Sequence, residues 1–198
     1  MASLVRKVVG AILPRSVKSF IGNTTVNNRK FMLRIARKMF FSNRMRMGLY
    51  RWLGLKADEG SIIWCGNKIN DCINISLGRN SILGPCNVLL AQGGIEIGEN
   101  VNISGFCFII SQEHDIHDPG LRTTLAPVII EDYAWIATGV TILPGVRIGK
   151  GAIIAAGSIV TKNVEAFAVM AGNPARKIAE RNSELAYTTH DDRGLKWL

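Results

Sequence analysis

The residues best suited to chemistry lie in one short stretch, residues 111–122, with the sequence SQEHDIHDPGLR. This stretch holds two of the chain's three histidines, His114 and His117, while His190 lies near the C-terminal end. Imidazole changes charge near neutral pH and is the most frequent general base in enzymes. A lone histidine in a loop is more often structural or solvated, so the elements around the stretch decide between the two interpretations.

Those elements follow a repeat of six residues. One phase is aliphatic without exception: Ile130, Ile136, Ile142, Ile148, Ile154 and Val160. The positions four residues later are small or β-branched: Ala134, Val140, Val146, Ala152, Ser158 and Val164. A repeat this short predicts an all-β solenoid, in which each unit buries its apolar side only by stacking on its neighbours. Three units make one triangular coil, so the six units predict two coils.

The same phase continues upstream with less regularity. Its members are Leu77, Leu83, Leu89 and Ile95, followed with an offset of two by Ile97, Ile103 and Ile109. We therefore expect one solenoid that begins near Ile69 or Ile75 and has a two-residue irregularity near Gly93 and Gly94. The repeat is interrupted at residues 111–127, which predicts a loop inserted between two regular runs, and such loops often carry function.

Composition and charge suggest three segments in the 198 residues. Residues 1–56 hold 13 of the 24 lysines and arginines and no acid, whereas the rest of the chain holds 11 bases and 15 acids. We expect a basic helical segment at 1–56, a solenoid domain at 57–181 and a polar tail at 182–198. No apolar run approaches the 18 or so residues that span a bilayer, which favours a cytoplasmic protein. The four cysteines form no CxxC pair and are interpreted as small buried residues, with no metal site.

The basic segment allows two interpretations. Residues 29–39 are predicted to form an amphipathic helix, with Met32, Ile35 and Ala36 on its apolar face and basic residues opposite. Such a helix could cap the exposed first coil of the solenoid, which is the favoured interpretation. Alternatively, the segment could bind an anionic membrane surface, at about 1 kcal/mol for each cation. No nucleic acid partner is expected, because no nucleic-acid-binding motif accompanies the charge.

The order of repeat, histidine loop and Trp135-Ile136 resembles the hexapeptide-repeat acyltransferases, in particular the maltose, galactoside and lipopolysaccharide O-acetyltransferase branch. The resemblance implies a left-handed parallel β-helix and identifies His114 as the catalytic residue of a His-x-x-x-Asp-Pro loop. It also implies acetyl-CoA as the donor and a sugar hydroxyl as the acceptor. His114 would take the proton of the hydroxyl, with its ring oriented by Glu113, by Asp115 or by a backbone carbonyl.

The resemblance extends to the donor site, over roughly residues 60–181. It places cofactor-binding roles on Trp135, Thr138, Ala156, Thr161, Lys162, Arg176 and Ala179. Thr138 matches a small polar residue that contacts CoA, and Ala156 lines the pantetheine path. Lys162 and Arg176 suit phosphate recognition, although each could equally be an ordinary surface charge. The glycine that usually follows Trp-Ile is Ala137 here.

The acceptor and the assembly are less defined. Asn87, Gln92 and His117 are weak candidates for acceptor contacts, since Gly84 and Gln92 occupy places where some relatives have Asn and Asp. In the family the donor lies between subunits, which implies a homotrimer. The basic N-terminal segment favours an acceptor in O-antigen, capsule or another lipid-linked glycan, with the enzyme at the inner face of the membrane.

Three other functions remain open at this stage. A serine acetyltransferase shares the fold and donor but has a long N-terminal helical domain. A γ-type carbonic anhydrase needs three histidines at one metal, and the chain has three in all. A non-catalytic solenoid scaffold would not need His114 together with Lys162 and Arg176.

Overall fold

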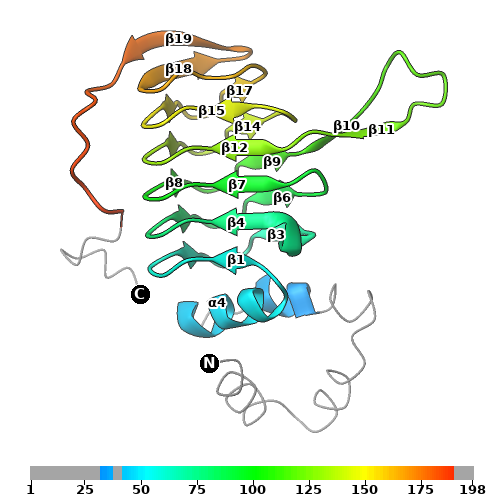
Figure 1. Cartoon of the computed structure of the whole chain (residues 1–198), viewed down its shortest axis with the longest axis vertical. Coiled ribbons are helices and arrows are strands. Elements are labelled where there is room, and N and C mark those ends of the chain that lie inside the picture. The colour runs from blue at the N-terminus through cyan, green and yellow to red at the C-terminus, as the bar shows by residue number, and fades with distance from the viewer. Residues whose placement is uncertain (1–31, 38–41, 190–198) are drawn as a thin grey trace, which may run out of the picture.

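The structure is a computed structural model, and it describes residues 32–37 and 42–189. The chain winds into three-sided coils that stack along one axis, with helices at the bottom and a hairpin projecting from one side (Figure 1). The predicted all-β solenoid, a parallel β-helix, is confirmed.

Each side of the coils is a sheet of parallel strands, apart from one antiparallel strand at the end of one sheet. Sheet A contains β1 (Lys56–Ala57), β4 (Ile75–Leu77), β7 (Ile95–Ile97), β12 (Val128–Ile130) and β15 (Arg147–Ile148). Sheet B contains β2 (Ile62–Ile63), β5 (Ile82–Leu83), β8 (Asn102–Ile103), β13 (Trp135–Ile136), β16 (Ile153–Ile154), β18 (Ala168–Gly172) and β19 (Ala175–Glu180). The antiparallel strand is β19, which pairs with β18 at the end of sheet B. Sheet C contains β3 (Lys68–Asn70), β6 (Val88–Leu90), β9 (Phe108–Ile110), β14 (Thr141–Ile142) and β17 (Ile159–Val160). We call the corners between them AB, BC and CA.

The aliphatic phase of the repeat forms the core. Ile130, Ile136, Ile142, Ile148, Ile154 and Val160 are all buried, with at most 1% of their surface exposed. The two regular coils run from β12 to β17, as the six units predict. Each coil there has 18 residues, because Ile129 pairs with Arg147.

The upstream coils are longer, which corrects the single irregularity expected near Gly93. Ser76 pairs with Glu96, so these coils have 20 residues. The additional two residues lie at corner CA in each coil, first at the 3₁₀ turn η1 (Cys72–Asn74) and then at residues 91–94. The solenoid also begins earlier than Ile69, at β1. Corner CA is therefore enlarged in the two coils that lie below the inserted hairpin.

The helical end of the chain covers the first coil. Residues 32–37 are helical, and Met32 and Ala36 are buried in the core cluster; residues 1–31 and 38–41, including the rest of the expected helix, lie outside the described residues. Helix α4 (Asn43–Trp52) packs under sheet B and buries Met47 and Tyr50. None of the described helices is both long enough and apolar enough to cross a bilayer.

Arginines of this cap bond to the backbone of the first coil. Carbonyls on the free edge of that coil have no further coil to pair with, so they need other donors. Arg46 Nε donates to Ile63 O at 2.6 Å, Arg51 Nε to Ala57 O at 3.0 Å, and Arg37 Nε to Gly66 O at 3.1 Å. Part of the positive charge of the N-terminal segment therefore has a structural role.

Replacing Arg46 should destabilise the fold. Arg46 is only 3% exposed, and its burial lowers the pKa of the guanidinium. Arg46→Ala would leave the Ile63 carbonyl without its donor and open a gap under sheet B. We expect a loss of about 2–3 kcal/mol in unfolding free energy, measured by denaturant titration. Arg44→Ala, on the exposed side of α4, should change it by less than about 0.5 kcal/mol; equal losses would contradict this role.

Residues 181–189 run back along corner AB. Arg181 Nη1 donates to the carbonyls of Tyr133 and Gly151, at 3.1 and 3.3 Å. The ring of Tyr187 meets that of Tyr133 edge-on, with centroids 5.6 Å apart, and Thr189 bonds to the carbonyl of Asn80. This part of the expected polar tail thus packs on several coils (Figure 1).

Candidate active site

The inserted stretch forms a β-hairpin that leaves the solenoid at corner CA (Figure 1). Its strands are β10 (Gln112–His114) and β11 (Thr123–Leu125), paired antiparallel with His114 opposite Thr123. At the root, Ala126 N–H donates to Ser111 O and Gly93 N–H donates to Ser111 Oγ, at 3.0 and 2.9 Å. A Cβ at Gly93 would collide with the Ser111 carbonyl, so glycine is required for the close approach of this corner to the hairpin.

His114 is exposed near the end of β10, and its ring is oriented by a backbone carbonyl. The Nδ1 atom lies 2.9 Å from Leu121 O and 3.5 Å from Thr123 Oγ1. A carbonyl only accepts, so this bond places the proton on Nδ1 and leaves the lone pair of Nε2 free. The sequence left three groups that could orient the ring: Glu113, Asp115 or a backbone carbonyl. Among the described residues, the ring bonds to the carbonyl of Leu121 and to neither acid.

Two aspartates shape the turn that supplies this carbonyl. Asp118 Oδ1 accepts from Gly120 N–H at 2.7 Å, and the Asp118 carbonyl accepts from Leu121 N–H at 2.8 Å. Asp118 also forms an ion pair with Arg122. Asp115 Oδ1 accepts from His117 N–H at 2.9 Å. Leu121 itself has a φ of 47°, an unfavourable conformation for a leucine, so these bonds hold its carbonyl where His114 needs it.

Asp118 should therefore act as a positioning residue. Asp118→Ala removes the bond to Gly120 and releases the Leu121 carbonyl, and we expect kcat to fall about tenfold. Asp118→Asn keeps an oxygen that accepts from Gly120 and should recover most of that loss. Steady-state kinetics test both variants, with an unchanged KM for the acyl donor as the sign that the donor site is intact. Wild-type kcat in Asp118→Ala would contradict the role.

The three weak acceptor candidates have different surroundings. His117 is exposed on the hairpin and is held through its backbone alone. Asn87 is fully buried at corner BC, where its amide donates to Gly84 O at 2.9 Å and accepts from Cys107 N–H at 2.7 Å. The prediction that Asn87 contacts the acceptor is therefore wrong, because its side chain is buried and its amide bonds join one coil to the next. Gln92 is partly exposed beside the hairpin root at corner CA.

Two of the donor candidates come together on corner BC, on adjacent coils. Thr138 and Ala156 are both exposed, and Gly157 N–H donates to Thr138 O at 2.9 Å. Gly139 and Gly157 have φ values of 73° and 70°, as tight solenoid corners require. A Cβ on Gly157 would meet nothing within 4 Å. The corner is thus an open strip of small residues that fits a thin, extended ligand.

The other donor candidates lie on two different sides. Trp135 is 44% exposed on sheet B, where β13, β16, β18 and β19 are consecutive strands. Arg176 and Ala179 are exposed on β19, opposite Ala171 and Val169. Thr161 and Lys162 instead follow β17 at corner CA, the corner that also carries the hairpin. One chain therefore does not gather all the expected donor residues on one surface.

Cysteine and metal chemistry receive no support from the described residues. Among them, no group of three or more His, Cys, Asp or Glu side chains is placed to hold a metal; His190 lies outside them. Cys72 and Cys107 are buried, and burial raises the pKa of the Cys107 thiol. Cys86 is exposed, which corrects the interpretation of all four cysteines as buried residues.

Comparison with known proteins places the chain among acetyltransferases. Residues 127–162 match the family described as bacterial transferase hexapeptide (six repeats). The chain is 33% identical over 138 residues to WcaF of Escherichia coli K12, described as a colanic acid biosynthesis acetyltransferase. The aligned residues cover 70% of this chain and 76% of WcaF.

Two solved structures share most of the fold. A maltose O-acetyltransferase from Clostridium difficile 630 is 30% identical with a TM-score of 0.71, covering 79% of this chain and 86% of that one. A galactoside acetyltransferase in complex with coenzyme A is 26% identical with a TM-score of 0.72, covering 86% of this chain and 85% of the other.

Proposed function

Since the chain belongs to the hexapeptide-repeat acyltransferase family, we propose that it is an O-acetyltransferase that transfers an acetyl group from acetyl-CoA to a sugar hydroxyl in surface polysaccharide biosynthesis. The fold, the family and the acetyltransferase names of its relatives agree with this reaction. The relatives also argue against a serine acetyltransferase, a carbonic anhydrase or a scaffold.

The orientation of His114 is the observation that carries the mechanism. With Nδ1 held by the Leu121 carbonyl, Nε2 is the base that faces away from the hairpin's own turn. An alcohol is a poor nucleophile until its proton is removed, and Nε2 takes that proton as the oxygen attacks the thioester carbonyl. The imidazolium then returns the proton to the departing thiolate, so the base is regenerated in each turnover.

The chain's residues fit a CoA thioester along corner BC. Thr138, Ala156 and Gly157 leave a strip without large side chains, which suits the pantetheine arm. Arg176, exposed on β19, could pair with phosphate at one end of such a ligand. We assign Trp135 and Ala179 to the same donor surface on sheet B, and Thr161 and Lys162 to the part of the donor site nearest corner CA.

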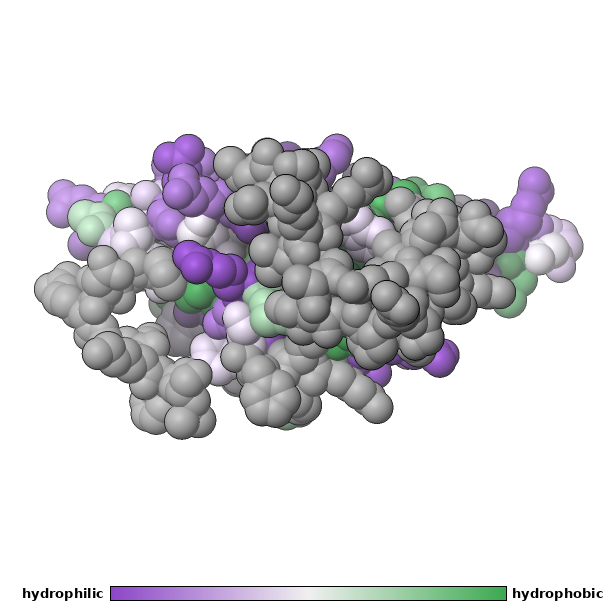
Figure 2. Space-filling view, turned by 90° about the horizontal axis from the view of Figure 1, so that it is seen from below, coloured by the Kyte–Doolittle hydropathy of each residue, from purple (hydrophilic) through white to green (hydrophobic). Residues whose placement is uncertain are grey.

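The active site would form between two copies of the chain in a homotrimer. His114 projects from corner CA, whereas Thr138 and Ala156 lie on corner BC, and sheet C separates the two corners. The hairpin also exposes Ile116 by 80% and Leu125 by 57%. Figure 2 shows hydrophobic beside hydrophilic surface on the part that protrudes at the right. A neighbouring copy would cover these side chains and bring its donor strip to His114.

Contact with an anionic membrane through residues 1–56 remains a prediction. The absence of acids from this segment supports it. Arg37, Arg46 and Arg51, however, already bond to the first coil. Co-sedimentation with anionic liposomes at low and high salt tests the contact; no binding at low salt would exclude it, and with it the location at the inner membrane face.

The reaction can be tested by following free thiol released from acetyl-CoA. We expect release that depends on an added sugar or oligosaccharide and a product that carries one acetyl ester, detected by mass spectrometry. Release that is equally fast without any sugar, or with serine as the acceptor, would contradict the proposal.

A further inference from the structure

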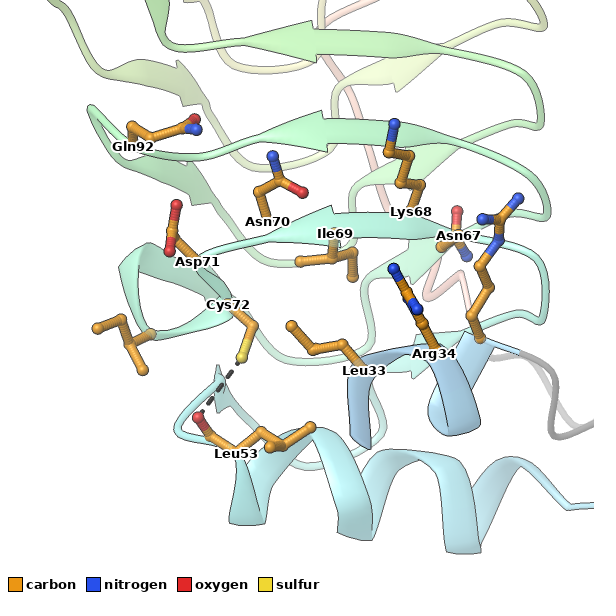
Figure 3. Close-up of a pocket in the computed structure, with 12 residues that line it drawn as sticks. Leu33, Arg34, Leu53, Asn67, Lys68, Ile69, Asn70, Asp71, Cys72 and Gln92 are labelled. Atoms are coloured by element: carbon orange, nitrogen blue, oxygen red, sulfur yellow. Dashed lines mark hydrogen bonds between the residues drawn. The ribbon is translucent and has the colours of Figure 1, made fainter. Parts of the chain in front are cut away.

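A pocket of about 490 Å³ lies between the helical residues 32–37, η1 and the outer face of β3 (Figure 3). It is distinct from the donor strip on corner BC. It lies two coils below the hairpin, at the enlarged corner CA. The pocket forms where the enlarged corner leaves space between the helical cap and the outer face of sheet C.

One wall of the pocket is positively charged. Arg34, Arg37 and Lys68 line it, and Arg34 and Lys68 lie on the same side in Figure 3, with Asp71 on the opposite side. Arg37 is committed to the Gly66 carbonyl, but the four ion pairs found among the described residues involve neither Arg34 nor Lys68. Residues 1–56 contain no acid, so the adjoining segment of this chain cannot neutralise them.

The opposite side of the pocket offers an unsatisfied acceptor. Gln92 lines the pocket, and its Oε1 atom is buried without a hydrogen-bond partner among the described residues. A buried acceptor without a donor is unfavourable, and a turn of the Gln92 side chain toward the pocket would let a bound hydroxyl supply the missing bond. The next residue, Gly93, bonds to Ser111 at the hairpin root, so the edge of the pocket formed by Gln92 lies next to the root of the hairpin that carries His114.

We propose that this pocket selects a phosphorylated acceptor: its phosphate or diphosphate pairs with Arg34 and Lys68, and a sugar hydroxyl donates to Gln92 Oε1. The proposal rests on the proposed sugar acetylation and names the class of acceptor. Arginine and lysine side chains without carboxylate partners are typical phosphate ligands. Sugar phosphates, nucleotide-linked sugars and lipid-linked saccharides all carry the required group.

Binding of inorganic pyrophosphate tests the site without any reaction. Titration calorimetry would compare the wild type, an Arg34→Gln/Lys68→Gln double variant and Arg79→Gln, an exposed arginine on corner AB that serves as the matched control. Saturating coenzyme A blocks the donor site during the titration. We expect the double variant to bind at least about tenfold more weakly and the control to bind like the wild type. Equal affinities, or no binding to the wild type, would overturn the proposal.

Kinetics separate this proposal from the proposed function. We expect glucose 1-phosphate to have a KM at least about tenfold below that of glucose in the wild type, and to lose this advantage in the double variant. Acetylation of both sugars with equal KM would reject the phosphate site but keep the O-acetyltransferase. If neither glucose nor glucose 1-phosphate is acetylated, but the double variant loses pyrophosphate binding, the phosphate site stands and the proposed acetylation of sugars is rejected. If the double variant loses binding to phosphatidylglycerol vesicles but binds pyrophosphate like the wild type, Arg34 and Lys68 contact a membrane and the proposed phosphate site is overturned.

Discussion

His114→Ala should lower kcat by about 10²- to 10⁴-fold, because it removes the group that we propose as the base for the acceptor hydroxyl. The KM for acetyl-CoA should stay within about twofold, since His114 does not lie on the donor strip. The side chain is exposed, so the unfolding transition should not move. Steady-state rates of thiol release together with thermal unfolding measure both expectations.

His117→Ala is the matched control for this variant. His117 lies on the same hairpin and is also exposed, but only its backbone N–H is engaged. We expect a change in kcat of less than about threefold. A His114→Ala protein with wild-type turnover, or a His117→Ala protein with the larger loss, would remove His114 from the mechanism.

Two inactive variants should restore each other's activity when they share one trimer. His114→Ala removes the base, and Ala156→Trp fills the donor strip with an indole. If each site combines the hairpin of one copy with corner BC of the next, a trimer that contains both variants has one intact site among its three. Co-expression with two affinity tags and sequential purification isolates such trimers, which should show about one third of wild-type kcat.

The outcome depends on where the two residues of one site come from. If His114 and Ala156 of a single copy formed the site, every copy in the mixed trimer would lack one of them and activity would stay absent. The doubly substituted chain, paired with itself, provides the inactive reference. Purification of a monomer that is fully active would equally contradict a shared site.

The core of the solenoid could be predicted from the sequence, because the six-residue spacing of the aliphatic residues follows directly from the need to bury them. Ile136 and Ile142 must face inward at fixed spacing, and no other arrangement buries them. The upstream phase was harder to interpret, because two extra residues at corner CA recur in each coil. The apolar residues at those corners, Cys72, Ile73 and Ala91, lie outside the six-residue phase, so they give no periodic signal from which the length of a turn could be predicted.

The site was predictable in part. The histidine could be chosen from its loop, but the group that orients it could not, since the Leu121 carbonyl depends on backbone geometry and not on a side chain. The Asp118-Pro119-Gly120 turn was the available signal for it. Asn87 was misassigned because a buried amide that joins two coils has the same sequence appearance as a polar ligand. The bonds of Arg46 under the first coil were likewise invisible in a count of charges.

The most direct test is a crystal structure of the protein with coenzyme A. We expect a trimer in which the cofactor lies along corner BC of one copy. Its sulfur should lie within about 4–5 Å of the Nε2 atom of His114 from the adjacent copy, close enough for an acceptor hydroxyl to lie between them. A sulfur atom far from every copy's His114, with no groove between copies to seat it, would contradict the assignment.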